Sequence, residues 1–194
     1  MILSIKLYLH KFIHTFVQES SKYLQAIGQT MDFNRLDYIK NVSANHGWAY
    51  SECPIALGAY FQLNFKRGED KDKKSIDDHA LHLPKGSLII LSQRPPESER
   101  YLTHVVELVN EGNEDKEQWT PGMWGVFRWV KVHWIANFQK PSSIPHDEDE
   151  MKVNWGWYDT KAKRLDSPNL MSEWENMEEL RLYLKKVFSQ HRNS

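Results

Sequence analysis

The run from Trp124 to Ile135 restricts the fold of this 194-residue chain more than any other feature. It is rich in Val and Trp, a composition typical of a β-strand. It is also longer than the roughly five or six residues of an average strand. We therefore expect a bulge or a sharp bend within it, and a strongly twisted sheet around it.

Four further segments have the composition of strands. From Ala59 to Phe65 apolar and polar residues alternate, which predicts a half-buried strand. Short apolar or aromatic runs predict the other three, at 88–91, 101–109 and 153–158. Strands of this length and twist tend to curl, so we expect a twisted antiparallel sheet or a half-open barrel.

Helices are expected at both ends of the chain. Apolar residues at helical spacing between Leu9 and Ile27 predict one helix, and Asp32 is expected to begin a second that carries Phe33, Leu36 and Ile39. At the other end, Ser172 and Glu175 have the spacing of a capping box before a helix that runs to Phe188.

Two polar runs are expected to connect these elements: a solvated charged loop at 66–78 and a linker at 141–150. The predicted fold is thus α+β, with an N-terminal helical extension at 1–45 and a sheet domain at 46–194. The N-terminal helices could also form a homodimer.

Charge and cysteine content narrow the function classes. The chain has 25 basic and 26 acidic residues, which argues against strong non-specific binding of nucleic acid but permits a local basic groove. Cys53 is the only cysteine, so no disulfide within the chain is possible and a reducing compartment such as the cytoplasm is expected. No apolar run reaches the roughly 20 residues of a membrane span.

Enzymatic signals are weak. The sequence has no nucleophile elbow, phosphate loop or dinucleotide fingerprint. Cys53 beside Pro54 is more typical of packing than of catalysis, and His79 and His82 adjoin a charged run rather than a metal motif. We therefore expect a binding protein without catalytic residues, metal or cofactor. The alternatives are an enzyme acting on nucleosides or nucleic acid through Cys53 or the two histidines, and a protein-interaction module.

The tryptophans indicate what is bound. Trp119 and Trp124 flank a Pro-Gly loop just before the long strand. Aromatic side chains at the mouth of a barrel can hold a flat ligand such as a flipped base, at about 1–3 kcal/mol per stacking contact. The alternative is that both indoles simply cover the core.

A family resemblance supports the first interpretation. Trp119, Trp124, Gly125, Phe127 and the run 132–135 resemble the segment of YTH domains that leads from a cage tryptophan into a strand. The segments 88–92 and 105–108 are similar to the central hairpin of that family and of the wider PUA-like superfamily, which includes EVE and ASCH domains. The ASCH-type amidohydrolase signature is absent.

This resemblance implies a PUA-like (YTH/EVE-like) domain that holds a modified, often methylated, base of RNA or DNA in an aromatic cage. Such domains act in RNA regulation or in restriction and defence systems. The segment around Trp48 resembles the family's other cage tryptophan, although no strand is expected before it here. The expected ligand-binding residues are Trp48, Ser92, Thr103, Trp119 and Trp124. The residues expected to contact the nucleic-acid backbone are Lys66, Arg94, Arg100 and Arg128.

Overall fold

The computed structural model describes residues 31–44, 46–52, 55–66, 73–95, 98–115, 125–155 and 161–191. The chain divides between Met31 and Asp32 into two compact units, and the fold below is that of the second unit. The helix predicted between Leu9 and Ile27, like Cys53 and both loop tryptophans, lies outside the described residues.

The described chain forms one six-stranded sheet in the order β2-β5-β4-β3-β1-β6. Its strands are β1 (Leu36–Val42), β2 (Tyr60–Phe65), β3 (Leu88–Gln93), β4 (Tyr101–Leu108), β5 (Val126–Ile135) and β6 (Ala162–Arg164). All neighbouring pairs are antiparallel except β1 and β3, which are parallel. The α+β class is confirmed, and the expectation of a purely antiparallel sheet is wrong.

Two strands, β1 and the short β6, were not predicted from the sequence. Asp32 caps only a 3-10 turn, η1 (Phe33–Arg35), by accepting a hydrogen bond of 3.0 Å from the Asn34 amide. The chain then enters β1, five of whose seven residues are buried. Burial on both faces requires apolar residues without strict alternation, and such a run also matches helical spacing. The predicted second helix is therefore wrong, and residues 36–42 belong to the sheet.

The bulge expected in the long strand is present in β5. The partners of Val105 and Val106 in β4 are Trp134 and Val132, so His133 is the extra residue. Before the bulge, alternate residues of β5 point into the core; beyond it, Trp134 packs against Phe188 of α4 (Met177–Gln190) with ring centroids 4.8 Å apart. The bulge lets a single strand contribute to both sides of the sheet.

The sheet curls into a half-open barrel around one core. Although β1 and β2 are distant in the strand order, the Lys40 ammonium lies 4.7 Å from the centre of the Phe65 ring. The buried core on the inner side comes from strands, loops and α2 (Lys73–His82): Tyr38, Val42, Ala49, Phe61, Leu63, Phe65, Ile76, Ala80, Leu83, Ile89, Leu91, Val106, Leu108, Val126, Val130, Val132 and Ala162.

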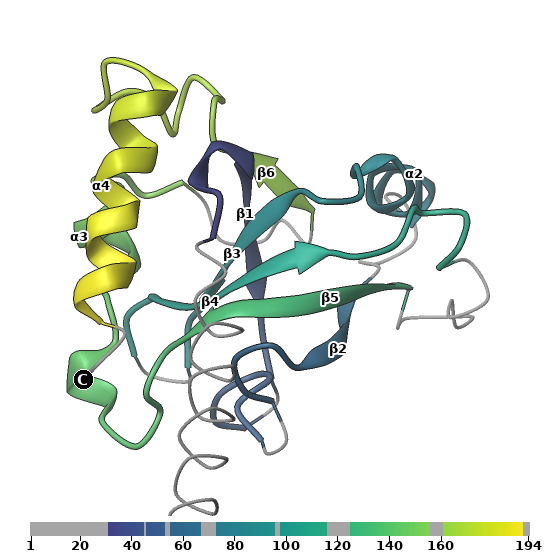
Figure 1. The fold of residues 1–194 in the computed structure, drawn as a ribbon, viewed down its shortest axis with the longest axis horizontal. Helices are drawn as coiled ribbons and strands as arrows, with labels where there is room; N and C mark the ends of the chain where they lie inside the picture. Colours follow the sequence, from purple (N-terminus) through teal and green to yellow (C-terminus); the bar gives the residue numbers. More distant parts are fainter. Residues whose placement is uncertain are drawn as a thin grey trace, which may run out of the picture. The chain divides into compact units, whose positions relative to one another are not determined.

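Three α-helices occur in the described chain, with α4 and α3 (Asp147–Met151) at one side of the sheet and α2 at the other (Figure 1). The charged run 66–78 therefore ends in a helix rather than a loop, and the expected linker contains α3 and a 3-10 turn, η4 (Pro141–Ser143). Residues 153–155 are not a strand. None of the described helices is long and apolar enough to cross a bilayer.

The C-terminal helix is confirmed, but its cap is not the expected one. The side chain of Asn176 accepts a hydrogen bond of 3.0 Å from the Glu179 amide, so the helix begins after Asn176 instead of after Ser172. The Glu179 carboxylate in turn accepts from the Glu175 amide at 2.8 Å. Asn176 and Glu179 have the spacing of a capping box, but the Glu179 carboxylate accepts from the amide before the cap residue rather than from that of Asn176.

Arg128, expected to contact nucleic acid, is fully buried inside the barrel end. Its guanidinium pairs with Asp115 at 2.8 Å, donates to the carbonyl oxygens of Ala80 and Leu83 at the end of α2, and donates to the Asn110 carbonyl at 2.6 Å. Arg128 therefore fastens α2 to the sheet and is not accessible to a phosphate.

Replacing Arg128 with Met should lower the free energy of unfolding by about 3–5 kcal/mol, because the carboxylate of Asp115 stays buried without its partner. Urea denaturation measures this change. The matched control is Lys186→Met on the exposed side of α4. Equal denaturation midpoints for the two variants would contradict the anchoring role.

Candidate ligand-binding site

A cavity of about 420 Å³ lies where the half-barrel stays open. β2 forms one edge of the sheet. Near the other edge, β6 pairs with β1 only from Tyr38 to Lys40, so the sheet does not close between β1 and β2. The cavity is lined by Lys40, Asn41, Val42, Ser43, Ala44, Ala49, Tyr50, Gln62, Asn64, Lys66 and Phe127. Its volume falls in the range of about 300–1,000 Å³ typical of small-molecule sites.

The lining combines groups that suit a flat, polar ligand. Asn41, Gln62 and Asn64 contribute side-chain amides, each with donors and an acceptor. Tyr50 and Phe127 contribute aromatic surface. Amides can pair with the donor and acceptor pattern on the edge of a nucleobase, while an aromatic ring can cover its face.

Gln93 of β3 holds the loop that forms one wall of the cavity. Its buried side chain donates to the Gly47 carbonyl at 2.9 Å and accepts from the Ala49 amide at 2.7 Å. The two bonds bracket Trp48, whose own carbonyl accepts from the Ser51 hydroxyl at 2.8 Å. The loop is therefore fixed before any ligand arrives, as a precise binding site requires.

Tyr50 lies in the same loop and is held from two sides. Its backbone is left-handed, with φ of 57°, and its carbonyl accepts from Nε2 of His104 at 3.1 Å. Its hydroxyl accepts from the Asn64 amide of β2 at 3.0 Å, and its ring packs 4.5 Å from that of Phe61. Burial raises the pKa of this hydroxyl, which stays neutral. Tyr50 thus links the loop to the edge strand of the barrel.

His104 is neutral because it is buried. Burial lowers its pKa to about 4, although the hydrogen bond to the Tyr50 carbonyl acts in the opposite direction. The hydroxyl of Thr103 lies 3.0 Å from Nδ1 of His104 and 3.2 Å from the Leu91 carbonyl, and its single proton serves one of them at a time. Thr103, predicted to bind ligand, is instead a buried part of this support.

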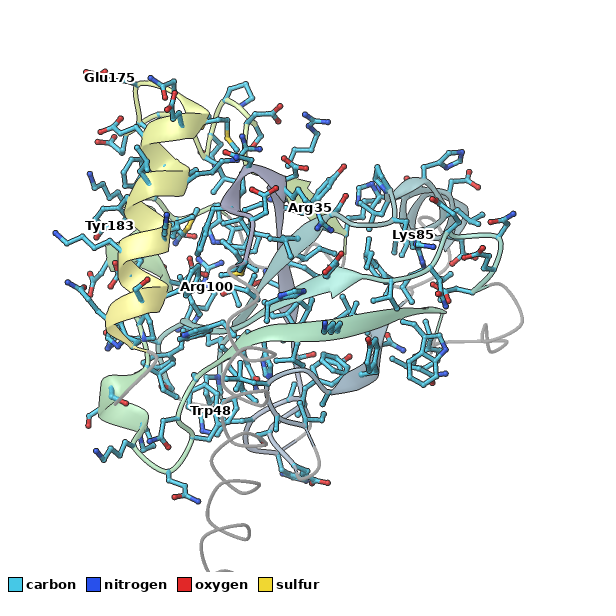
Figure 2. All side chains as sticks on the ribbon, viewed as in Figure 1. Arg35, Trp48, Lys85, Arg100, Glu175 and Tyr183 are labelled. Atoms are coloured by element: carbon cyan, nitrogen blue, oxygen red, sulfur yellow. The ribbon has the colours of Figure 1, made fainter. Side chains whose placement is uncertain are left out.

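Trp48 lies on the loop below the sheet in Figure 2 but is not among the residues lining the cavity. Its ring packs against those of Tyr101 and Phe138, with centroids 5.4 Å away in both cases. The structure therefore places Trp48 in an aromatic cluster next to the cavity loop. Trp119 and Trp124, its expected partners, lie outside the described residues.

Ser92 belongs to a buried polar network beneath α3. Its hydroxyl donates to Asp147, which also accepts from the Trp155 indole at 2.8 Å. Burial raises the pKa of Asp147, although the hydrogen bonds from Ser92 and Trp155 and the charge of Arg100 oppose that shift. Ser92 is fully buried, so it is not placed to recognise a ligand.

Arg100 is the cation of the same network (Figure 2). Its side chain is almost fully buried, lies 3.7 Å from Asp147 and donates to Asn154 at 2.9 Å. It lines a second, polar cavity of about 340 Å³ together with Arg94, which is exposed and donates to the Ser98 carbonyl at 2.7 Å. Among the expected backbone contacts, only Arg94 and Lys66 have exposed side chains.

His79 and His82, considered for catalysis, lie on α2. Among the described residues, no group of three His, Cys, Asp or Glu side chains is suited to hold a metal. Asn41, Gln62, Asn64 and Gln93 were missed as site residues. For Gln62 and Asn64 a signal existed, because both occupy the polar positions of the alternating strand.

No protein-family model matches the chain, and neither the curated proteins nor the solved structures contain a significant match. The site must therefore be interpreted from its own geometry.

Acid should destabilise the protein through His104. The folded pKa of about 4 lies below the ordinary 6.5, so this stability is complete above about pH 6.5 and is lost as the pH falls towards 4. The loss should approach about 3 kcal/mol. Denaturation at several pH values should show a weaker dependence for His104→Gln, which cannot titrate, than for the exposed control His46→Gln. Equal dependence in both variants would contradict this assignment.

Removing the Gln93 side-chain amide should loosen the cavity loop. Gln93→Met leaves the Gly47 carbonyl and the Ala49 amide without their buried partner, which should lower the unfolding free energy by about 2–4 kcal/mol. Hydrogen exchange of the Ala49 amide should accelerate. If exchange there matches that in the exposed control Gln139→Met, Gln93 does not hold the loop.

Proposed function

We propose that this protein binds a modified, most simply methylated, base of a nucleic acid in the cavity between β1 and β2. The observation that carries the proposal is the cavity itself, in which three amides and two aromatic side chains line the open seam of the barrel. Such a site offers hydrogen bonds to the edge of a base and apolar surface to its face.

Chain connectivity relates the loop tryptophans to this cavity. Trp124 directly precedes Gly125, a buried residue with φ of 67° at the start of β5. Phe127, two positions further, lines the cavity. We therefore assign Trp119 and Trp124 as aromatic walls for the base, with a methyl group desolvated between them.

The order of elements supports the family resemblance. A strand precedes the cage tryptophan in the family that this chain resembles, and β1 precedes Trp48 here. The chain therefore does not lack a strand before Trp48, contrary to what was expected from the sequence. We propose a PUA-like, YTH/EVE-like domain on this basis, in which Asn41, Gln62 and Asn64 recognise the base edge in place of Ser92 and Thr103.

Lys66 and Arg94 remain as contacts for phosphates, since both side chains are exposed. Lys66 also lines the cavity, so it is the nearer of the two to the proposed base. A reader of this kind needs no metal or cofactor, and it would serve either RNA regulation or a restriction or defence system.

Titration of intrinsic fluorescence with methylated and unmethylated nucleosides tests the proposal. Asn64→Ala should weaken binding of every base about 5- to 100-fold, because a hydrogen bond in the cavity is lost. Trp119→Ala should instead remove the preference for the methylated form. The control is Leu182→Ala, an exposed site on α4. Absence of saturable binding, or unchanged affinity in both site variants, would refute the proposal.

A further inference from the structure

A strip of partly exposed side chains continues from the cavity along the outer face of β2 and β5. Successive residues of a strand point to opposite faces, so the core residues Phe61, Leu63 and Phe65 define the inner face of β2. The other face of the two strands carries three cross-strand pairs: Tyr60 with Lys131, Gln62 with Trp129, and Asn64 with Phe127.

These pairs are arranged so that their side chains are close together. The Asn64 amide donates to the Tyr50 hydroxyl, which shows that the even-numbered residues of β2 direct their N–H groups away from β5. The three pairs are therefore non-hydrogen-bonded pairs, in which side chains approach most closely. A row of aromatic, amide and cationic groups results, and we call these six residues the outer strip.

The aromatic members of the outer strip are available for stacking. Tyr60 is 58% exposed and is one of the three most exposed large hydrophobic residues of the described chain. Trp129 and Phe127 are partly exposed. Within the described residues, none of these three rings packs against another aromatic ring. Contiguous exposed aromatic surface often marks a binding site.

Charge selects the class of partner. Lys131 lies at one end of the outer strip and Lys66, which continues β2 beyond Asn64, lies at the other. The nearby carboxylate of Glu107 is already engaged by Arg35 and His133, and these partners hold its pKa low against the effect of burial. Cations at both ends of an aromatic row suit a single nucleic-acid strand, whose phosphates alternate with bases.

The length of the strip fits this partner. From the Asn64 pair to the Tyr60 pair is four residues of strand, or roughly 13 Å at the usual rise per residue. That length can hold a few nucleotides, since phosphates along one strand of a duplex are roughly 3.4 Å apart and an unstacked single strand is more extended. Gln62, Asn64 and Phe127 belong both to the outer strip and to the cavity lining.

We propose that the outer strip binds the single-stranded nucleotides that flank the base held in the cavity, by stacking on Tyr60 and Trp129 and by pairing phosphates with Lys131 and Lys66. That the bound nucleotides flank a base in the cavity rests on the proposed function, but the stacking of nucleotides on the outer strip does not. The strip does not distinguish RNA from DNA, since both offer bases and phosphates.

Unmodified oligouridylates and oligothymidylates of increasing length test the inference on the full chain. Affinity should increase with length up to a few nucleotides. Tyr60→Ala should lower the affinity for the longer oligonucleotides about 5- to 100-fold, because one stacking contact is lost, and should leave nucleoside binding unchanged. Lys131→Gln should reduce the slope of log affinity against log salt concentration by about 0.7. The matched control is Leu182→Ala, which removes an equally exposed apolar side chain from α4.

The outcomes separate this inference from the proposed function. If methylated nucleosides bind but Tyr60→Ala behaves like Leu182→Ala with long oligonucleotides, the outer strip is overturned and the cavity assignment survives. If long oligonucleotides bind through Tyr60 while nucleosides do not bind, the strip is supported and the base pocket fails. If the full chain binds no oligonucleotide, the inference is overturned.

Discussion

The candidate site depends on the attachment of one short loop to the inside of the sheet. Gln93 and His104, buried side chains of neighbouring strands, hold the backbone of residues 47–50 through three hydrogen bonds. Through this loop, the hydroxyl of Tyr50 reaches the edge of β2. Each such bond contributes only about 1 kcal/mol, but an unmade buried bond costs more, so the loop has one favourable position. The cavity keeps its shape because that position is fixed.

Buried polar bonds also hold the two ends of the sheet, where pairs of charged side chains take the place of apolar packing. Arg128 with Asp115 joins α2 to β5, and Arg100 with Asp147 joins the start of β4 to α3. Charges removed from water must be paired, so breaking either network by removing one partner is strongly destabilising.

Local patterns predicted β2, the central hairpin, the long bulged strand and the C-terminal helix, because each has a regular period or a clear composition within a few residues. They missed β1, where burial on both faces removes the alternation that identifies a strand, and β6, whose three residues are too few to show a pattern. The cavity itself could not be predicted, because it joins Asn41 to Gln62 and Asn64 across strands that meet only when the sheet curls. The inward orientation of Arg128 was predictable, because Arg128 lies two residues from both Val126 and Val130 and alternate residues of a strand point to the same face.

The central claim is that a base enters the seam between β1 and β2, and the side-chain amides there provide the most direct test. NMR titration of the full chain with a methylated nucleoside would follow the side-chain resonances of Asn41, Gln62 and Asn64 together with the amide of Ala49. Binding of a base in the seam should give saturable shifts concentrated at these groups, with little change at Asn154 in the second cavity. Shifts centred on Asn154, or no saturable shift at the three seam amides, would contradict it.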